Sequence, residues 1–201
     1  DRVRSSMYRA ENARKELQSQ SVDLASYYAS LSMVLEIRLA DDLSVPRVAQ
    51  LTQKTNQFNL TTRRYSEAQI HALCQDPSVD LVHLRLKDRF GDSGLTGVCI
   101  LRYEDGHARI DTFLLSCRVL GRGVEDAFLI QCMKRARHKG CASAIGEFVP
   151  TAKNGQVRDF YANHGFSAIE GGQPSFLFEL DLKANTIRNL MHSTLYAQDH
   201  L

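Results

Sequence analysis

Apolar and polar residues alternate along several stretches of the chain and recur at helical spacing along others. Alternation is typical of β-strands, and recurrence every three to four residues is typical of an amphipathic helix. Alternating stretches predict strands over 34–39, 80–87, 95–103, 107–116, 141–149 and 175–182. Helical spacing predicts helices from 45 to about 53, from 66 to 74, from 124 to 139 and, shorter, from 154 to 163.

Boundary residues support these elements. Ser44 is a helix N-cap candidate, with Pro46 in the first turn. The helix after Gly123 has acidic residues in its first turn and basic residues in its last turn, which complements the helix dipole. Tight turns join three consecutive strands into an antiparallel meander. The order β-α-α-β-β-β-α-β-α-β therefore predicts an α/β protein with a mixed, mostly antiparallel sheet and helices on both faces.

The ends of the chain differ from this pattern. Residues 1–32 form a polar, helical segment with only scattered apolar positions, so we expect a linker helix that joins two domains or packs on a neighbour. The domain itself spans 33–184, and the C-terminal tail 185–201 has room for one more helix. The chain begins at Asp1 without a leader pattern, so we expect it to be a piece of a longer protein.

Composition excludes several classes of protein. Hydrophobic residues make up 43% and charged residues 24%, and the net charge of +2 argues against nucleic acid as a partner. No apolar run is long enough for a membrane span. The five cysteines contain no CxxC and the histidines no HxH or HxxxH, which argues against a disulfide framework or a metal site. We expect a cytoplasmic protein with no bound metal.

The strongest local signal is the run from Ser116 to Val124. Gly121 and Gly123 would let the backbone approach a ligand, and the free N–H groups of the helix start would face an anion. Arg118 and Arg122 would add charge-assisted hydrogen bonds. Cys117, just before this loop, is predicted to have a lowered pKa and to act as a nucleophile. The alternative is a cysteine that only fills the core.

This run carries a resemblance to the GNAT acyltransferase superfamily. Arg118-x-x-Gly121-x-Gly123 resembles the GNAT pyrophosphate loop, which also includes Val119. Asn154 together with Phe160-Tyr161-Ala162-Asn163-His164-Gly165-Phe166 resembles the second GNAT signature, N…FYxxxGF. The resemblance implies a GNAT-like fold over residues 33–182. It implies that Asn154 contacts a pantetheine arm and that Tyr161 protonates a leaving thiolate.

A narrower resemblance is to FkbH-like proteins. It rests on three runs, residues 47–65, 88–92 and 111–125. Such proteins join an N-terminal HAD-type phosphatase domain to a GNAT-like domain in polyketide-type biosynthesis. The resemblance implies transfer of a glyceryl or similar hydroxyacyl group, derived from a phosphorylated three-carbon acid, to an acyl carrier protein. No DxDx(T/V) motif is present, so the phosphatase domain is absent from this sequence.

The resemblance also implies roles for individual residues. Cys117 would hold the acyl group as a thioester and pass it to the phosphopantetheine thiol of the carrier protein, with no permanently bound cofactor. The segment from Asn56 to Arg64 would lie over the acyl group, and its amides suit hydroxyl groups. Asn56, Gln57 and Asn59 would contact the substrate and could stabilise an oxyanion, and Arg63 or Arg64 would bind a carboxylate or phosphate. The alternative is a polar loop between two helices, with Asn and Thr as caps.

Two other functions fit the same sequence. One is a CoA-dependent N-acetyltransferase, which uses the loop for pyrophosphate and needs no cysteine at position 117. The other is a non-catalytic, GNAT-like docking module for the carrier protein, which predicts a buried, unreactive Cys117. His83 and His107 lie on neighbouring predicted strands and are candidates for an activating base.

Overall fold

A computed structural model describes residues 2–171 and 174–183 of the chain. The further helix considered for the C-terminal tail lies outside the described residues. The strands are β1 (Val34–Leu39), β2 (Val79–Asp88), β3 (Gly91–Glu104), β4 (His107–Leu115), β5 (Ser143–Phe148), β6 (Ser167–Ile169) and β7 (Phe176–Asp181). The helices are α1 (Arg2–Gln20), α2 (Leu24–Leu31), α3 (Val45–Lys54), α4 (Glu67–Gln75), α5 (Val124–His138) and α6 (Phe160–Asn163), with short 3-10 turns η1 (Cys117–Val119) and η2 (Gly155–Val157).

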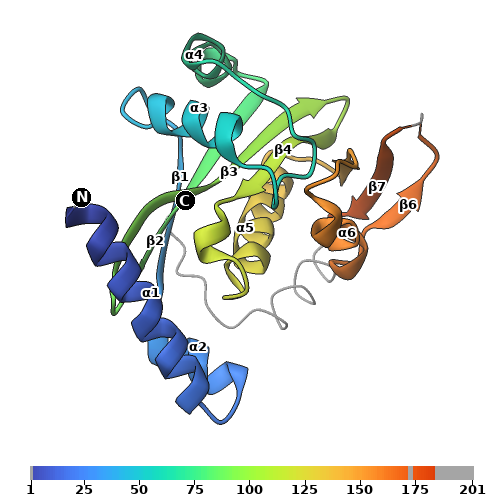
Figure 1. The fold of residues 1–201 in the computed structure, drawn as a ribbon. Helices are drawn as coiled ribbons and strands as arrows, with labels where there is room; N and C mark the ends of the chain where they lie inside the picture. Colours follow the sequence, from blue (N-terminus) through green and yellow to red (C-terminus); the bar gives the residue numbers. More distant parts are fainter. Residues whose placement is uncertain (1, 172–173, 184–201) are drawn as a thin grey trace.

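The strands form one sheet in the order β1-β2-β3-β4-β5-β7-β6 (Figure 1). Only the β4–β5 pair is parallel; the other neighbours in the described sheet are antiparallel. The predicted mixed, mostly antiparallel sheet is confirmed. β6 was not predicted, because it has only three residues and depends on pairing with β7.

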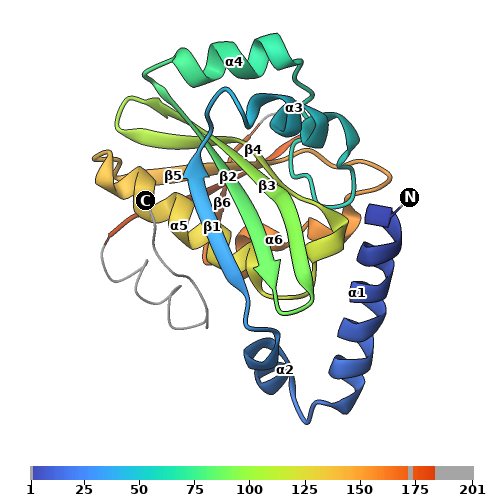
Figure 2. The ribbon, with the colours of Figure 1, turned by 90° about the vertical axis from the view of Figure 1, so that its left-hand side faces the viewer.

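Strand alternation divides the apolar side chains between the two faces of the sheet. On β2, Val82 belongs to the core beneath α5, whereas Leu81 belongs to the core beneath α3 and α4. On β3, Cys99 and Val98 divide in the same way. Figure 2 shows α5 behind the strands, with α3 and α4 at the top. Burying both faces explains why the central strands are so rich in apolar residues.

The helix starts obey local capping rules to different degrees. Ser66 caps α4 in a full capping box with Gln69. Ser44 stands at the N-cap of α3, as predicted, but its side chain bonds to the backbone of Asp41 instead of capping the helix. The β3–β4 turn has positive φ at Asp105 and Gly106, which suits a two-residue hairpin.

β4 and β5 pair only over their first residues, from His107 to Ile110 on β4. Beyond that point a loop segment lies between them. Leu60 N–H donates to Phe113 O (3.1 Å) and Leu115 N–H donates to Phe58 O (3.0 Å). Val149 N–H donates to Leu60 O (2.8 Å). Residues 58–60 thus satisfy the backbone groups that the diverging strands would otherwise leave unpaired.

The polar N-terminal segment forms two helices that turn at residues 21–23, where Asp23 caps α2 by accepting from Ser26 N–H (2.7 Å). α1 does not project away from the domain. It runs alongside the β2–β3 hairpin (Figure 2), and Arg14 forms a two-point ion pair with Asp88 at the end of β2 (2.7 and 2.9 Å). α1 therefore packs on the domain through this ion pair, and its predicted role as a linker to a second domain stays a prediction.

Candidate functional site

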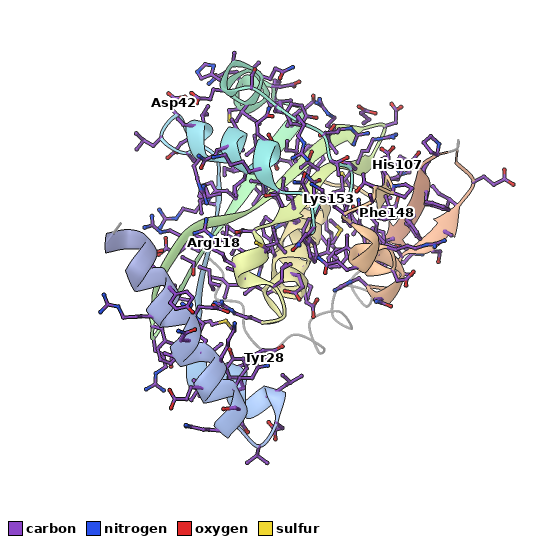
Figure 3. The ribbon with its side chains drawn as sticks, in the orientation of Figure 1. Tyr28, Asp42, His107, Arg118, Phe148 and Lys153 are labelled. Atoms are coloured by element: carbon purple, nitrogen blue, oxygen red, sulfur yellow. The ribbon has the colours of Figure 1, made fainter. Side chains whose placement is uncertain are left out.

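Cys117 lies in a cavity of about 410 Å³ between α1, the β2–β3 hairpin and η1. Its side chain is exposed and begins the 3-10 turn that follows β4. The cavity is lined by Ala10, Glu11, Arg14, Phe90, Gly91, Asp92, Ser93, Cys117 and Arg118. Figure 3 shows Arg118 between α1 and the start of α5. The volume is in the range of small-molecule sites, and the lining combines a thiol with groups of both charges.

All five cysteines lie in the described part of the chain, and among them Cys117 alone is exposed. Cys99, Cys132 and Cys141 are buried, and burial raises the pKa of the Cys99 and Cys141 thiols. Cys74 is half-buried on α4, and burial raises its pKa also. A thiolate that must reach a substrate requires exposure. The exposure of Cys117 therefore contradicts what the docking-module alternative predicts for it.

A buried ion-pair cluster underlies this cavity and joins three parts of the chain. The Asp88 side chain is fully buried and accepts hydrogen bonds from Arg14 (2.7 and 2.9 Å) and from Arg122 (3.3 Å). Arg122 also donates to Glu11 on α1 (3.2 Å) and to the carbonyl of Arg118 (2.6 Å). The cluster holds α1, the hairpin and the turn of Cys117 in one arrangement.

This cluster corrects the prediction for Arg122. Its guanidinium is directed to Asp88, Glu11 and a carbonyl rather than to an anion in front of the loop. Its side chain is only 6% exposed. An arginine with these partners anchors the loop from behind, so it does not serve as the predicted phosphate ligand.

The loop before α5 has the predicted glycine conformation, and side chains of the chain itself lie against it. Gly121 and Gly123 both have positive φ. Burial is the largest influence on the Glu125 carboxyl and raises its pKa, and its Oε2 has no hydrogen-bond partner. Tyr28 on α2 donates to the Gly121 carbonyl (2.9 Å). Glu125, in the first turn of α5, thus adds an acidic side chain beside the loop that the motif assigned to a pyrophosphate. Val119 packs in the core, and its N–H donates to Ser116 O.

The segment from Asn56 to Arg64 also has internal partners. Asn59 is fully buried and bonds to Thr55 O (3.2 Å) and Thr62 N–H (2.8 Å), which corrects its assignment as a substrate contact. Arg64 bonds to the carbonyls of Thr52 and Thr55 and to the Asn56 side chain. Gln57 is exposed. None of these residues lines the Cys117 cavity, so the structure does not bring the two predicted groups together.

Arg63 belongs to a separate cluster of charges on β3, β4 and β5. It donates to Glu147 (2.7 Å) and to the Asp111 carbonyl (2.6 Å). Arg102 bonds to the Asp111 carboxylate (3.2 Å), and Arg109 bonds to Glu147 (3.4 Å). These carboxylates take the place that a substrate carboxylate or phosphate was predicted to occupy beside Arg63.

The two residues of the second GNAT-like motif are buried. Asn154 is fully buried and bonds to Asn59 O (3.0 Å), Val149 O (2.9 Å) and Thr151 N–H (2.7 Å). Tyr161 is fully buried, its hydroxyl has no hydrogen-bond partner, and burial raises its pKa well above the ordinary value. Its ring fills the space above Gly146, where a Cβ would lie 2.5 Å away. Both residues stabilise this conformation, and Tyr161 is not placed to protonate a group at Cys117.

Neither of the two histidines predicted as an activating base, His83 and His107, lines the cavity. His107 lies on the opposite side of the molecule from Arg118 (Figure 3), where its Nδ1 contacts Ser143 Oγ (2.8 Å). His83 is half-buried and does not line the cavity, its Nδ1 is buried without a hydrogen-bond partner, and burial lowers its pKa. In the described part of the chain, the ionisable lining beside Cys117 consists instead of Glu11, Arg14, Asp92 and Arg118.

Sequence reasoning did not include α1 in the site. Ala10 and Arg14 are four residues apart and therefore lie on one face of α1, which is the signal that could have indicated a packed helix. Over residues 2–171 and 174–183, no three His, Cys, Asp or Glu side chains are grouped to hold a metal ion. None of the described helices combines the length and apolar character that a membrane span requires.

No protein-family model and no curated protein matches the chain. Solved structures do. The Escherichia coli ribosomal-protein-S18-alanine N-acetyltransferase is similar, with a TM-score of 0.56 at 14% identity over 74% of this chain and 94% of that one. The Thermoplasma acidophilum PaiA N-acetyltransferase, solved with coenzyme A, has a TM-score of 0.54 at 15% identity, covering 73% and 98%.

A Desulfovibrio desulfuricans protein assigned to the GNAT family has a TM-score of 0.56 at 15% identity, covering 76% of this chain and 100% of that one. Identities this low establish the architecture alone. The chain therefore has a GNAT fold, as the loop and second signature predicted.

Proposed function

We propose that this domain is an acyltransferase that carries a glyceryl or similar hydroxyacyl group on Cys117 and delivers it to the phosphopantetheine thiol of an acyl carrier protein. The observation that supports this most is the exposed thiol of Cys117 inside a cavity of about 410 Å³. The FkbH-like runs supply the acyl class, and the GNAT fold agrees with acyl transfer as the reaction.

The chemistry consists of two acyl substitutions. In the first, Cys117 Sγ attacks the carbonyl carbon of an acyl phosphate, the C–S bond forms, the C–O bond to phosphate breaks, and the phosphate leaves with the thiol proton. In the second, the pantetheine sulfur attacks the same carbon, the bond to Cys117 breaks, and Sγ regains a proton from the incoming thiol. Arg118 lies at the cavity and would stabilise the negative charge of the leaving phosphate.

Two features favour a carrier protein over free CoA as the acceptor. The Glu125 carboxylate lies at the loop that would hold a pyrophosphate, and the first turn of α5 carries Asp126 as well. Negative groups in that position oppose a diphosphate. A protein-bound arm needs only to bring its thiol to the surface cavity of Cys117. A HAD-type phosphatase domain remains the proposed partner on the N-terminal side.

The second candidate is a CoA-dependent N-acetyltransferase. The fold favours it, since two of the similar structures are described as N-acetyltransferases and one of those was solved with coenzyme A. This candidate predicts that CoA stabilises the protein against heat in proportion to the logarithm of its concentration. The carrier-protein function predicts no such shift with CoA, and a shift with the holo carrier protein.

Intact-protein mass after incubation with a glyceryl-loaded carrier protein tests the main proposal. We expect one glyceryl adduct on the parent chain and none on Cys117→Ala. Cys74→Ala is the matched control, because Cys74 is a half-buried thiol that does not line the Cys117 cavity. This variant should be loaded like the parent. A folded parent that stays unmodified contradicts the covalent step.

A further inference from the structure

One wall of the Cys117 cavity comes from α1, outside the part of the chain that carries the GNAT-like motifs. Ala10, Glu11 and Arg14 contribute this wall, and the hairpin residues Phe90 to Ser93 contribute the facing one. The smallest side chain of the α1 wall is that of Ala10, which is half-buried. Any larger residue at this position would project into space that the cavity now contains.

The position of α1 is fixed by buried charges. Arg14 is 8% exposed and Arg122 is 6% exposed, and both contact the fully buried Asp88 carboxylate. Glu11 contacts both arginines, at 3.4 and 3.2 Å. Moving α1 outward would leave these charges without partners in a poorly solvated place, which is costly. The buried charges therefore hold this wall in place.

Figure 2 shows the same relation at the level of the elements, with α1 beside the turn end of the β2–β3 hairpin. Arg122 also donates to the carbonyl of Arg118, the residue after Cys117 (2.6 Å). The Arg122 side chain thus anchors both the α1 wall and the turn that begins at Cys117. The distance from the wall to the thiol is set by packing rather than by the covalent chain.

We propose that α1 is part of the acyl-transfer site and that Ala10 determines the size of the group that Cys117 accepts. The inference rests on the proposed function for its substrate, a small acyl group. A methyl side chain leaves room for a three-carbon hydroxyacyl group, whereas a branched four-carbon side chain would take that room. Ala10 is in this sense a specificity-determining residue.

The test compares small and bulky thiol reagents on Cys117, so it does not depend on acyl transfer. Iodoacetamide and fluorescein maleimide are applied to the full chain, and labelling of Cys117 is followed by peptide mass spectrometry. For Ala10→Leu we expect an unchanged rate with iodoacetamide and a rate about tenfold or more lower with the bulky maleimide. The matched control is Asn12→Leu, which adds the same residue at an exposed position of α1 and should change neither rate.

The same variants are then loaded from acetyl- and glyceryl-charged carrier proteins. We expect Ala10→Leu to reduce glyceryl loading and to spare acetyl loading. The inference would be overturned if the ratio of the maleimide labelling rate to the iodoacetamide labelling rate were the same in Ala10→Leu and Asn12→Leu. This holds whether or not the parent transfers acyl groups. If Ala10→Leu slows the bulky reagent but the parent takes up no acyl group, Ala10 still limits the size of the cavity, and the proposed function is contradicted.

Discussion

Two regions rich in polar groups lie near the end of β4, and they differ in what satisfies them. At the α5 loop and the β4–β5 gap, the chain supplies its own partners, with Tyr28 on the Gly121 carbonyl and residues 58–60 between the strands. At Cys117, the polar groups form the lining of an open cavity. The motifs that resemble a family fall mainly in the filled region, whereas the exposed Cys117 lies in the open one. A motif thus identifies a fold more securely than it identifies the place of the chemistry.

The largest effect is expected beneath the open region. Asp88→Asn removes the charge that compensates two buried arginines, so it should lower the free energy of unfolding by about 3–5 kcal/mol. Urea denaturation measures this change. Asp92→Asn, in an exposed ion pair with Arg85, should cost about 1 kcal/mol or less. Similar costs for the two variants would show that the cluster does not anchor α1.

The second-largest effect is expected in the filled region, next to the β4–β5 gap. Asn154→Ala leaves Val149 O, Asn59 O and Thr151 N–H without their side-chain partner, so it should lower the free energy of unfolding by about 1–3 kcal/mol. Iodoacetamide labelling of Cys117 in the folded variant should match that of the parent. Loss of labelling with little loss of stability would show that the two regions are coupled.

Tyr161→Phe separates packing from chemistry at the same place. Removing a buried hydroxyl that has no partner should leave stability unchanged or raise it by about 1 kcal/mol. Acyl loading of Cys117 should change little, because Tyr161 is fully buried and does not line the cavity. A large fall in loading at unchanged stability would restore Tyr161 as a proton donor.

The smallest effect is a pH dependence confined to the filled region. Burial lowers the pKa of His164, but bonds to Asp126 (2.9 Å) and to Phe160 O (2.7 Å) outweigh it, so the pKa is raised overall. The stabilisation is therefore fully present below the unfolded pKa of about 6.5 and is lost as pH rises through the higher folded value. Melting temperature against pH should show this fall, and Asp126→Asn should flatten it.

Local patterns determined much of the fold in advance. Alternation predicted six of the seven described strands because a strand buried on one or both faces must carry apolar side chains at fixed intervals. The one described strand that was not predicted is β6, because three residues are too few to show alternation of apolar and polar positions. The start of α5 was predictable because glycines with positive φ and acidic residues in the first turn are local requirements.

Site residues were predicted less well than elements. Cys117 was identified from its neighbours in the chain, and it does lie exposed at a cavity. Arg122 was assigned to an anion by the same reasoning, yet Asp88 and Glu11 contact it instead, from distant parts of the chain. Asn59 and Asn154 were assigned to ligands, although each bonds to backbone groups. Composition cannot distinguish these outcomes, because an amide or guanidinium suits a ligand and a buried backbone equally.

The sequence by itself determined the order of the elements, the two-faced sheet, the glycine turn and the candidate thiol, because each depends on neighbours within a few residues. Tertiary structure alone decided which polar groups remain open to a ligand. It placed residues 58–60 between β4 and β5 and set α1 against Cys117 through Asp88 and Arg122. The physical reason is that a hydrogen-bonding group accepts whichever partner folding brings within about 3 Å, and sequence distance does not fix that partner.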